Sequence, residues 1–250
     1  MIEANKRKGF EYVFQRYNEH YLLRRYFHEI TLRGELDWFE MERPVIYVMN
    51  HSSWWDGLLV YHVIRKTSSG DHYMMMDEKQ MNKYRFFRKI GAFSIDKSSV
   101  KGIWKSLHYA EKLLSNQGRV WLFPQGEIYH QDIRPLRLQS GIGYLLAKCP
   151  NTAVVPVTML TFLVQHQKPE ASIWVGDPML DAWDELERKN IVERVRVSLE
   201  KQLEKHRNLV IEEKITNVDP FVPILRAGYS TNDIFDAAQR RLKHWNSFFK

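Results

Sequence analysis

Residues 45–60, VIYVMNHSSWWDGLLV, join an apolar run to a polar turn and then to a second apolar run. Val45–Met49 is short and apolar throughout, which is typical of a strand covered on both faces. The polar residues after it predict a turn, and we expect a helix to begin near Trp54. A strand, a turn and a helix in this order open a βα unit. This stretch therefore predicts an α/β fold.

The same order recurs along the chain. Further apolar runs predict strands at Tyr73–Met76, Val120–Phe123, Val154–Thr158 and Ser172–Val175. Segments with helical spacing of apolar residues alternate with them, at Val100–Asn116, Gly141–Lys148 and Trp183–His206. We therefore expect a single domain over residues 1–250 with a mostly parallel central sheet flanked by helices.

Both ends of the chain differ from this α/β core, which we place at residues 34–210. Residues 1–33 are expected to form an amphipathic helical segment, in which apolar side chains alternate with basic ones; the apolar members are Phe10, Val13, Phe14, Tyr17 and Tyr21. Residues 211–250 are expected to form a helical extension, with aromatic and basic residues mixed over Ile234–Lys250. Such helices suit a lipid headgroup region, or they pack on the sheet and turn their charges to water.

The composition limits the class of protein. Of the 250 residues, 44% are hydrophobic and 13% aromatic, which indicates a folded chain. The net charge of +7 predicts an anionic partner, namely nucleic acid, a membrane surface or an anionic substrate. Nucleic acid is not expected, because no nucleic-acid motif is present and basic residues alternate with acidic ones. With no run of about 18 apolar residues, we expect a cytoplasmic protein that attaches peripherally to a membrane.

Metal and disulfide chemistry are not expected either. Cys149 is the single cysteine, so an internal disulfide and a multi-cysteine zinc site are excluded. The ten histidines are scattered without the spacing of metal ligands. We expect Cys149 to be structural, because it lies at the end of an apolar helical segment.

His51 and Asp56 are the first candidates for chemistry. Their spacing of five is wrong for one helix face, but it brings two side chains together across a turn that leads into a helix. A neutral imidazole accepts a hydroxyl proton near neutral pH, and a carboxylate on its other nitrogen fixes the tautomer. The alternative is structural: Ser53 and Asp56 match a capping box at the start of the helix.

Four short blocks, in order, resemble those of the glycerolipid acyltransferase family, which includes the 1-acylglycerol-3-phosphate acyltransferases. NHSSWWD at Asn50–Asp56 resembles the N-H-x4-D motif, and GAFSIDK at Gly91–Lys97 resembles G-x-I-F-I-D-R. FPQGE at Phe123–Glu127 is similar to F-P-E-G-T-R, and VVPVTM at Val154–Met159 to an apolar V-P-V run. The resemblance covers roughly residues 30–180.

This resemblance implies transfer of a fatty acyl group from acyl-CoA or an acyl carrier protein to a hydroxyl of a membrane lipid. His51 is then the general base, and Asp56 orients it. The thioester is a co-substrate, and no other cofactor is implied. The alternative is a peripheral membrane protein that binds lipid without catalysis and has kept the fold.

The candidate acceptor-binding residues are Lys97, Phe123, Pro124, Gln125, Gly126, Glu127, Arg134 and Arg137. The chain departs from the family in the third block, where Gln125 replaces Glu, Glu127 replaces Thr and the Arg is missing. A carboxylate repels a phosphate dianion, although Lys97, Arg134 and Arg137 offer positive charge unless they are only solvated surface cations. We therefore expect a hydroxyl-rich or other non-phosphate acceptor, such as a glycosyl, aminoacyl or carotenoid-type lipid. Lysophosphatidate remains the usual acceptor of the family.

Overall fold

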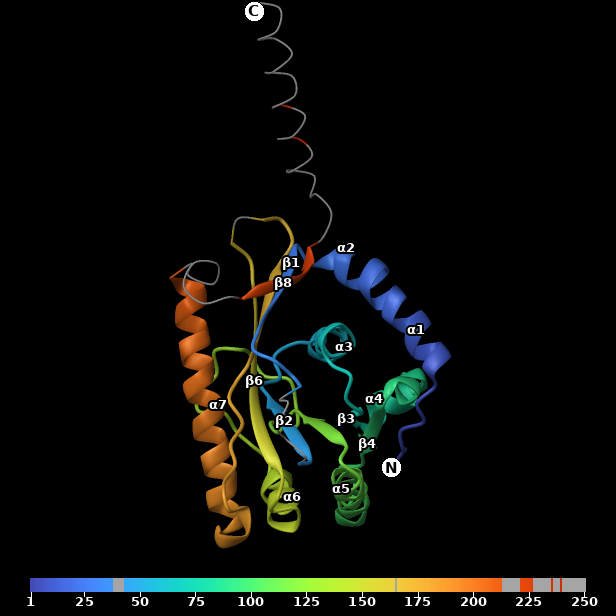
Figure 1. Cartoon of the computed structure of the whole chain (residues 1–250), viewed down its shortest axis with the longest axis vertical. Helices are drawn as coiled ribbons and strands as arrows, with labels where there is room; N and C mark the ends of the chain where they lie inside the picture. The colour runs from blue at the N-terminus through green and yellow to red at the C-terminus, as the bar shows by residue number, and fades with distance from the viewer. Residues whose placement is uncertain (38–42, 165, 213–220, 227–234, 236–238, 240–250) are drawn as a thin grey trace, which may run out of the picture.

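The central strand β2 is Val45–Met49, as the sequence predicts, and all five residues are buried in this computed structural model. The structure describes residues 1–37, 43–164, 166–212, 221–226, 235 and 239 (Figure 1). Two strands pair with β2 in parallel, β5 (Arg119–Leu122) on one side and β6 (Ala153–Phe162) on the other. β2 is therefore an interior strand, which explains its lack of polar residues.

Eight strands of the described residues form one sheet in the order β4-β3-β5-β2-β6-β7-β1-β8. Neighbouring strands are parallel except in the pairs β6–β7 and β1–β8. The remaining strands are β1 (Glu29–Arg33), β3 (His72–Asp77), β4 (Ala92–Ile95), β7 (Glu170–Val175) and β8 (Val222–Arg226). The expectation of a single α/β domain with a mostly parallel sheet is confirmed.

Helices cover both faces of this sheet (Figure 1). On one face lies α3 (Asp56–Thr67), with the N-terminal helices outside it: α1 (Lys8–Tyr17), a π-helix (Asn18–Leu23) and α2 (Arg24–Tyr26). On the other face lie α5 (Val100–Ser115), α6 (Gly141–Lys148) and α7 (Arg188–Ile211). The short connecting helices are α4 (Glu78–Lys83), Arg85–Ile90 and Trp183–Glu185.

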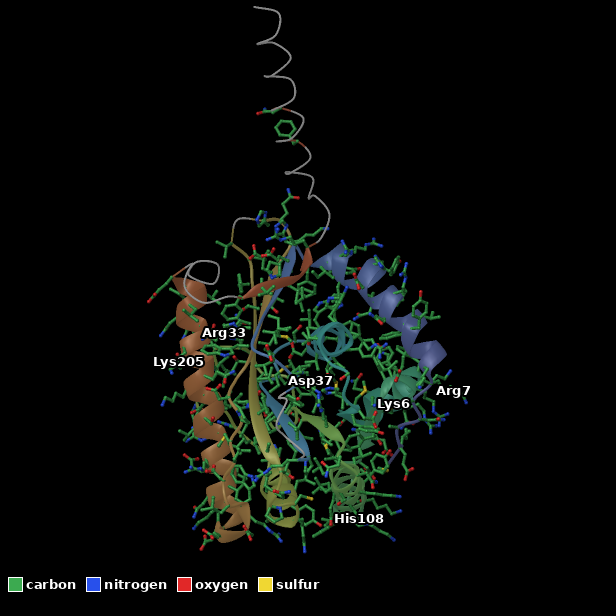
Figure 2. All side chains as sticks on the ribbon, in the orientation of Figure 1. Lys6, Arg7, Arg33, Asp37, His108 and Lys205 are labelled. Atoms are coloured by element: carbon green, nitrogen blue, oxygen red, sulfur yellow. The ribbon has the colours of Figure 1, made fainter. Side chains whose placement is uncertain are left out.

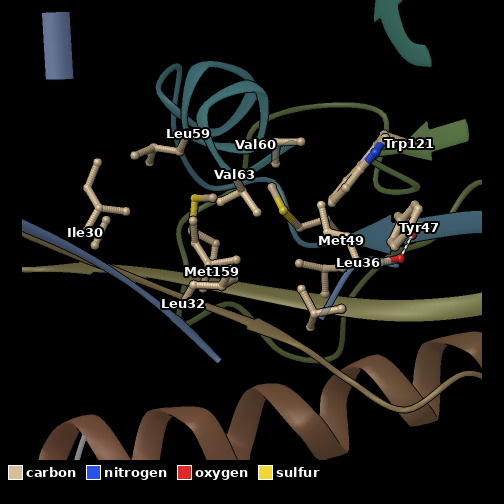
Figure 3. Packing of buried hydrophobic residues seen from close by; sticks show 14 of the residues in the cluster. Ile30, Leu32, Leu36, Tyr47, Met49, Leu59, Val60, Val63, Trp121 and Met159 are labelled. Carbon is tan, nitrogen blue, oxygen red and sulfur yellow. Dashed lines mark hydrogen bonds between the residues drawn. The ribbon is translucent and has the colours of Figure 1, made fainter. Parts of the chain in front are cut away.

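The two faces of β2 enter two different hydrophobic clusters. Tyr47 and Met49 pack with Leu59, Val60 and Val63 of α3 (Figure 3). The alternate residues, Ile46 and Val48, belong to the cluster under α5 and α6. Because side chains alternate along a strand, β2 must be apolar at every position to fill both clusters.

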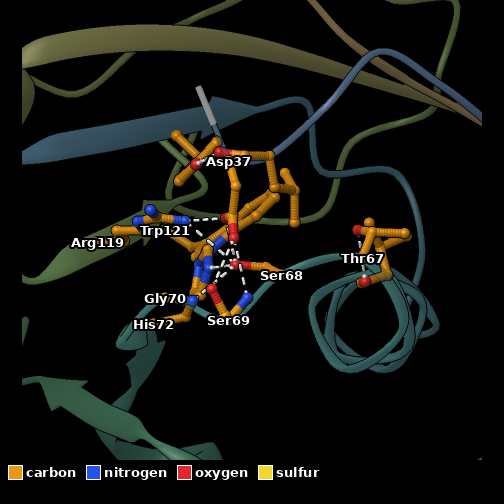
Figure 4. A network of polar contacts seen from close by, with 11 residues as sticks. Asp37, Thr67, Ser68, Ser69, Gly70, His72, Arg119 and Trp121 are labelled. Atoms are coloured by element: carbon orange, nitrogen blue, oxygen red, sulfur yellow. Dashed lines mark hydrogen bonds and ion pairs between the residues drawn. The ribbon is translucent and has the colours of Figure 1, made fainter. Parts of the chain in front are cut away.

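A polar network lies at the amino-terminal edge of the parallel strands, where β3 and β5 begin (Figure 4). The Ser68 hydroxyl donates to Asp37 Oδ1 at 2.5 Å, and His72 Nε2 lies 2.6 Å from the same hydroxyl oxygen. Trp121 Nε1 donates to His72 Nδ1 at 2.9 Å, and Arg119 pairs with Asp37. The network ties the segment after β1 to the end of α3 and to two strands.

Three strands lie where the sequence predicted none. Glu29–Arg33 was expected to end the N-terminal helical segment and is instead β1, with Leu32 and Ile30 buried. Ala92–Ile95 is β4, and Val222–Arg226, expected in the helical extension, is β8. Short strands at the sheet periphery are fixed by pairing with neighbours, which outweighs local propensity. Apart from residues 235 and 239, the helix predicted over residues 234–250 lies outside the described residues.

The N-terminal apolar stripe is divided between core and surface. Phe14 is 6% exposed and packs on Leu58 and Tyr61 of α3. In contrast, Tyr12, Val13, Tyr17, Tyr21 and Tyr26 are between 47% and 62% exposed. The N-terminal helices were expected either to enter a lipid headgroup region or to pack on the sheet. Phe14 packs on the fold. Among the described residues, no helix combines the length and the apolar character needed to cross a membrane.

Candidate active site

His51 lies just beyond the carboxyl end of β2, and Asp56 is the first residue of α3. The chain turns between them, so the two side chains meet although they are five residues apart. His51 Nδ1 lies 2.8 Å from Asp56 Oδ2. Ligand and catalytic groups of open α/β sheets gather at this edge, outside the carboxyl ends of the strands. The predicted partnership of His51 with Asp56 is present in the structure.

The Asp56 carboxylate organises the whole turn. Its Oδ2 atom also accepts the backbone N–H groups of Ser52 at 2.7 Å and Ser53 at 3.0 Å. The Asp56 side chain is fully buried, whereas that of His51 is 22% exposed. The second oxygen, Oδ1, is buried and has no hydrogen-bond partner among the described residues. Leaving a buried carboxylate oxygen without a hydrogen-bond partner carries a desolvation cost of about 1–3 kcal/mol or more.

The capping-box alternative is present only in part. The N–H of Ser53 donates to Asp56, as in the reciprocal half of a capping box. The Ser53 hydroxyl, however, accepts the N–H of Trp55 at 3.1 Å, and Trp55 is the N-cap residue. Asp56 thus shapes the start of α3 and contacts His51 with the same oxygen, so the two interpretations are compatible.

The third block holds His51 from the side of β5. The ring of Phe123 lies 4.4 Å from the imidazole, measured between ring centroids. The side-chain oxygen of Gln125 accepts the His51 N–H at 2.7 Å, and the Tyr129 N–H donates to the His51 carbonyl at 3.0 Å. Gln125 is 3% exposed, so its side chain points inward. The sequence did not indicate this supporting role, because burial of a single amide after a strand leaves no pattern.

The second and third blocks meet through Lys97. Its Nζ atom donates to the Gly126 carbonyl at 2.5 Å and lies 3.2 Å from Asp77 Oδ2. Gly126 has a φ of +79°, a conformation that favours glycine. The backbone N–H of Gln139 donates to the Pro124 carbonyl at 2.8 Å. The predicted binding residues Lys97, Pro124 and Gly126 therefore lie together. Asp77, which neutralises Lys97, was not predicted.

The first and fourth blocks meet through Asn50. Its amide makes a pair of 2.9 Å hydrogen bonds with the backbone of Met159, accepting the N–H and donating to the carbonyl. Asn50 is 2% exposed. This contact ties the end of β2 to β6 and fixes where the His51 turn begins. Asn50 belongs to the first block, but nothing in the sequence indicated that Met159 is its partner.

The remaining predicted residues lie further out. Glu127 and Arg137 are exposed. The Nε atom of Arg134 donates to Glu204 of α7 at 2.9 Å, and its Nη1 donates to the carbonyls of Gln131 and Ile133. Arg134 is thus engaged by the protein itself. Substrate binding by these residues stays a prediction.

The site is an edge of the sheet, distinct from a cavity of about 570 Å³ near the π-helix. That cavity is lined by Glu19, Arg24, Lys66 and Pro223–Arg226, and by neither His51 nor Asp56. Within the described residues, no group of three or more potential metal ligands occurs. Burial raises the pKa of the Cys149 thiol, which keeps it protonated and agrees with a structural role.

The sequence matches a known protein family, and the fold is similar to a solved structure. The family model described as Acyltransferase matches residues 24–160. Among solved structures, the fold is similar to that of PlsC, the 1-acyl-sn-glycerophosphate (LPA) acyltransferase from Thermotoga maritima, with a TM-score of 0.52 and 16% sequence identity over 78% of each chain. At this identity the likeness concerns the fold. No curated protein matches the sequence.

Proposed function

The chain belongs to the acyltransferase family, and from this premise we propose that it transfers a fatty acyl group from a thioester to a hydroxyl group of a lipid. The observation that carries the proposal is the 2.8 Å contact of His51 Nδ1 with the buried Asp56 carboxylate, at the carboxyl edge of the sheet. With Nδ1–H donating to Asp56, the lone pair of the neutral ring is on Nε2. Nε2 is then the nitrogen that accepts a proton.

The chemistry follows from that tautomer. Nε2 of His51 removes the proton of the acceptor hydroxyl as its oxygen attacks the thioester carbonyl carbon. The new C–O bond forms and the C–S bond breaks. The thiolate leaves and takes the proton from the imidazolium, so the products are an ester and a free thiol. No covalent enzyme intermediate is required.

Asp56 contributes electrostatically. The ring of His51 gains a positive charge when it takes the proton, and the carboxylate 2.8 Å away stabilises that charge. Asp56 is held in place beforehand by the N–H groups of Ser52 and Ser53. The favourable interaction grows only as the reaction proceeds, which lowers the barrier.

We further propose an acceptor whose head group carries no phosphate. PlsC is named for 1-acyl-sn-glycerophosphate, whose phosphate needs cationic partners. Here Lys97 is paired with Asp77 and Arg134 with Glu204. Glu127 follows Gly126, whose carbonyl accepts from Lys97, and its exposed carboxylate adds negative charge. Gln125 is occupied by the His51 amide, so Glu127 is the better partner for acceptor hydroxyls.

The lipid acceptor implies contact with a membrane surface, and we propose the outer side of the N-terminal helices for it. Tyr12, Tyr17 and Tyr21 are 60%, 47% and 52% exposed there. The guanidinium of Arg25 lies 5.8 Å from the ring centroid of Tyr21. Aromatic and basic side chains on one helix suit the boundary between headgroups and acyl chains.

A screen of acceptors tests the proposed function. Purified wild-type protein and His51→Ala are incubated with palmitoyl-CoA or palmitoyl-acyl carrier protein and with matched lipids that carry glycosyl, free hydroxyl or phosphate head groups. Mass spectrometry reads the ester product. We expect a new ester with wild type and very little with His51→Ala. Lipid binding by both proteins without any product would instead favour the non-enzymatic alternative.

A further inference from the structure

The exposed side of α5 carries a line of basic residues. Lys101, Lys105, His108 and Lys112 follow the spacing i, i+4, i+7 and i+11, which places them on one side of a helix. All four are exposed. Figure 2 shows α5 at the periphery of the molecule with His108 projecting outward. At about 1.5 Å per residue, the line from Lys101 to Lys112 is about 17 Å long.

These charges are not balanced by acidic neighbours. Among the described residues, Lys101, Lys105 and Lys112 form no ion pair, and His108 has only Glu111, at 3.3 Å. Some cations of α7 differ in this respect, because Arg194 pairs with Asp181 and Arg196 with two glutamates. The exposed side of α5 therefore presents three lysines whose charge no described acidic residue neutralises.

A large aromatic side chain lies beside this line. Trp104 is 49% exposed, and its ring meets that of Tyr144 of α6 at 4.7 Å in an edge-to-face arrangement. The guanidinium of Arg188 at the start of α7 lies 5.3 Å from the Tyr144 ring. Tryptophan, tyrosine and arginine are enriched in protein-binding surfaces. We define the basic face of α5 as Lys101, Trp104, Lys105, His108 and Lys112.

The basic face begins next to the candidate active site. Ser99 caps α5, and Lys97, two residues earlier, donates to the Gly126 carbonyl. Gln125, the neighbour of Gly126, accepts the His51 N–H. A partner bound along α5 thus reaches the edge of the sheet where His51 lies.

The basic face and the N-terminal tyrosines belong to opposite faces of the sheet. α5 covers the cluster that contains Ile46 and Val48, whereas α3, with α1 outside it, covers Tyr47 and Met49. If the acceptor arrives from a membrane under α1, the basic face of α5 is turned away from that membrane. Its partner is then expected to come from the aqueous side.

We propose that the basic face of α5 docks an acidic protein that carries the acyl group as a thioester. This inference rests on the proposed function, since it assigns the donor to the same site. A row about 17 Å long, with an aromatic anchor beside it, is more extended than one phosphate group requires. Complementary charge speeds encounter and orients the carrier, so the thioester is delivered towards His51.

Donor kinetics test the proposal. The double variant Lys101→Glu/Lys105→Glu is compared with wild type using acidic palmitoyl-acyl carrier protein and palmitoyl-CoA as alternative donors. We expect KM for the carrier to rise at least about tenfold, and kinetics with palmitoyl-CoA to change less than about twofold. Trp104→Ala should also raise KM for the carrier. Lys101 lies in the first turn of α5, where a negative charge is compatible with the helix dipole, and Lys105 is exposed in the second turn, so folding should be retained.

A matched control uses two exposed lysines with the same spacing on α7, Lys201→Glu/Lys205→Glu (Lys205 is labelled in Figure 2). This variant should behave as wild type with both donors. Three results would overturn the docking proposal: an equal rise of KM for both donors, no effect on either, or turnover with palmitoyl-CoA alone. The proposed function would survive all three, whereas it fails if neither donor yields an ester with any acceptor.

Discussion

At the scale of single residues, Asp56 is the group on which two roles converge. Its Oδ2 atom accepts two backbone N–H groups of the turn and contacts His51, and its Oδ1 atom is buried without a partner among the described residues. A residue that only caps the helix would need no more than the two backbone contacts. The additional contact with an imidazole is what a catalytic role requires.

Asp56→Asn separates these roles. The amide keeps a hydrogen-bond acceptor for the turn but loses the charge that stabilises the imidazolium. We expect kcat to fall by about 10²–10⁴-fold, while the free energy of unfolding falls by only about 1 kcal/mol, the cost of a weakened helix cap. Steady-state kinetics and urea unfolding measure the two quantities. Normal kcat with reduced stability would leave Asp56 as a cap alone.

Gln125 offers a second test, because its side chain accepts the His51 backbone N–H and so acts through His51. Gln125→Leu removes the acceptor and should lower kcat by about tenfold, with a smaller effect on the acceptor KM. Gln125→Glu restores an acceptor oxygen and should recover much of kcat. If Gln125→Leu raises only the acceptor KM, Gln125 binds substrate, as the sequence predicted, and does not position His51.

The local part of the site could be predicted from the sequence, and its long-range contacts could not. The His51–Asp56 pair was predictable, because strand, turn and helix follow one another within a few residues. The contacts of Asn50 with Met159 and of Gln125 with His51 span 109 and 74 residues. Such contacts depend on how distant strands pair, which a local pattern does not contain.

At the scale of elements, the apolar strands were predictable, whereas the edge strands β4 and β8 and the short strand β1 beside β8 were not. β2 is buried at every position and reads as a continuous apolar run. In β1, buried Thr31 lies beside buried Ile30 and Leu32, and polar Glu29 and Arg33 flank them. β8 is largely exposed. Short strands that are stabilised mainly by pairing with their neighbours carry little apolar signal of their own.

Two buried histidines, His72 of β3 and His206 of α7, should make stability depend on pH. Burial lowers the pKa of His72 to about 3, with Arg119 and Lys6 adding to the shift and Asp37 and Asp71 opposing it. Burial also lowers the pKa of His206 to about 3, helped by Arg33. Unfolded histidine titrates near pH 6.5. Between about pH 3 and 6.5 the unfolded chain therefore binds more protons, so acidification destabilises the fold.

Each of these histidines should remove about 1.4 kcal/mol of unfolding free energy per pH unit below about pH 6. His206 is the cleaner test, because among the described residues the partners of its ring nitrogens are the hydroxyls of Thr158 and Ser172, at 2.9 and 2.8 Å. In His206→Gln, the unfolding free energy measured with urea should fall less steeply from pH 7 to pH 5 than in wild type, by about 1 kcal/mol per pH unit on average, because unfolded histidine is only partly protonated near pH 7. Exposed His108→Gln is the control and should keep the wild-type slope. An unchanged slope in His206→Gln would contradict a buried neutral imidazole.

At the scale of the whole molecule, the two faces of the sheet are expected to serve different partners. The exposed tyrosines of the N-terminal helices lie on the side of α3, and the basic face of α5 lies on the other. His51 lies at the strand ends between them. An edge site of this kind gives a lipid and a soluble carrier separate approaches to one imidazole.

Vesicle binding tests the lipid side. Tyr17→Ser/Tyr21→Ser should reduce sedimentation with phosphatidylglycerol-containing vesicles, because two exposed aromatic rings are lost without disturbing the core. Binding of wild type should weaken as salt rises, since basic residues supply part of it. Phe14 is unsuitable for this test, because it is buried and its replacement would destabilise the fold.

The matched control, Val197→Ser/Ile211→Ser, removes two exposed apolar side chains from α7, which are 49% and 65% exposed. It should sediment as wild type does. Equal losses of vesicle binding in both double variants, or no binding of wild type at low salt, would contradict membrane attachment through the N-terminal helices.

The central claim is that His51 is the general base of an acyl transfer, and its most direct test is the rate of ester formation by His51→Ala. The rate is measured with the best donor and acceptor of wild type, alongside circular dichroism and thermal unfolding of both proteins. We expect a folded variant whose kcat is lower by about 10²–10⁴-fold, the usual contribution of a positioned base. A folded His51→Ala protein that forms the ester at nearly the wild-type rate would contradict the account.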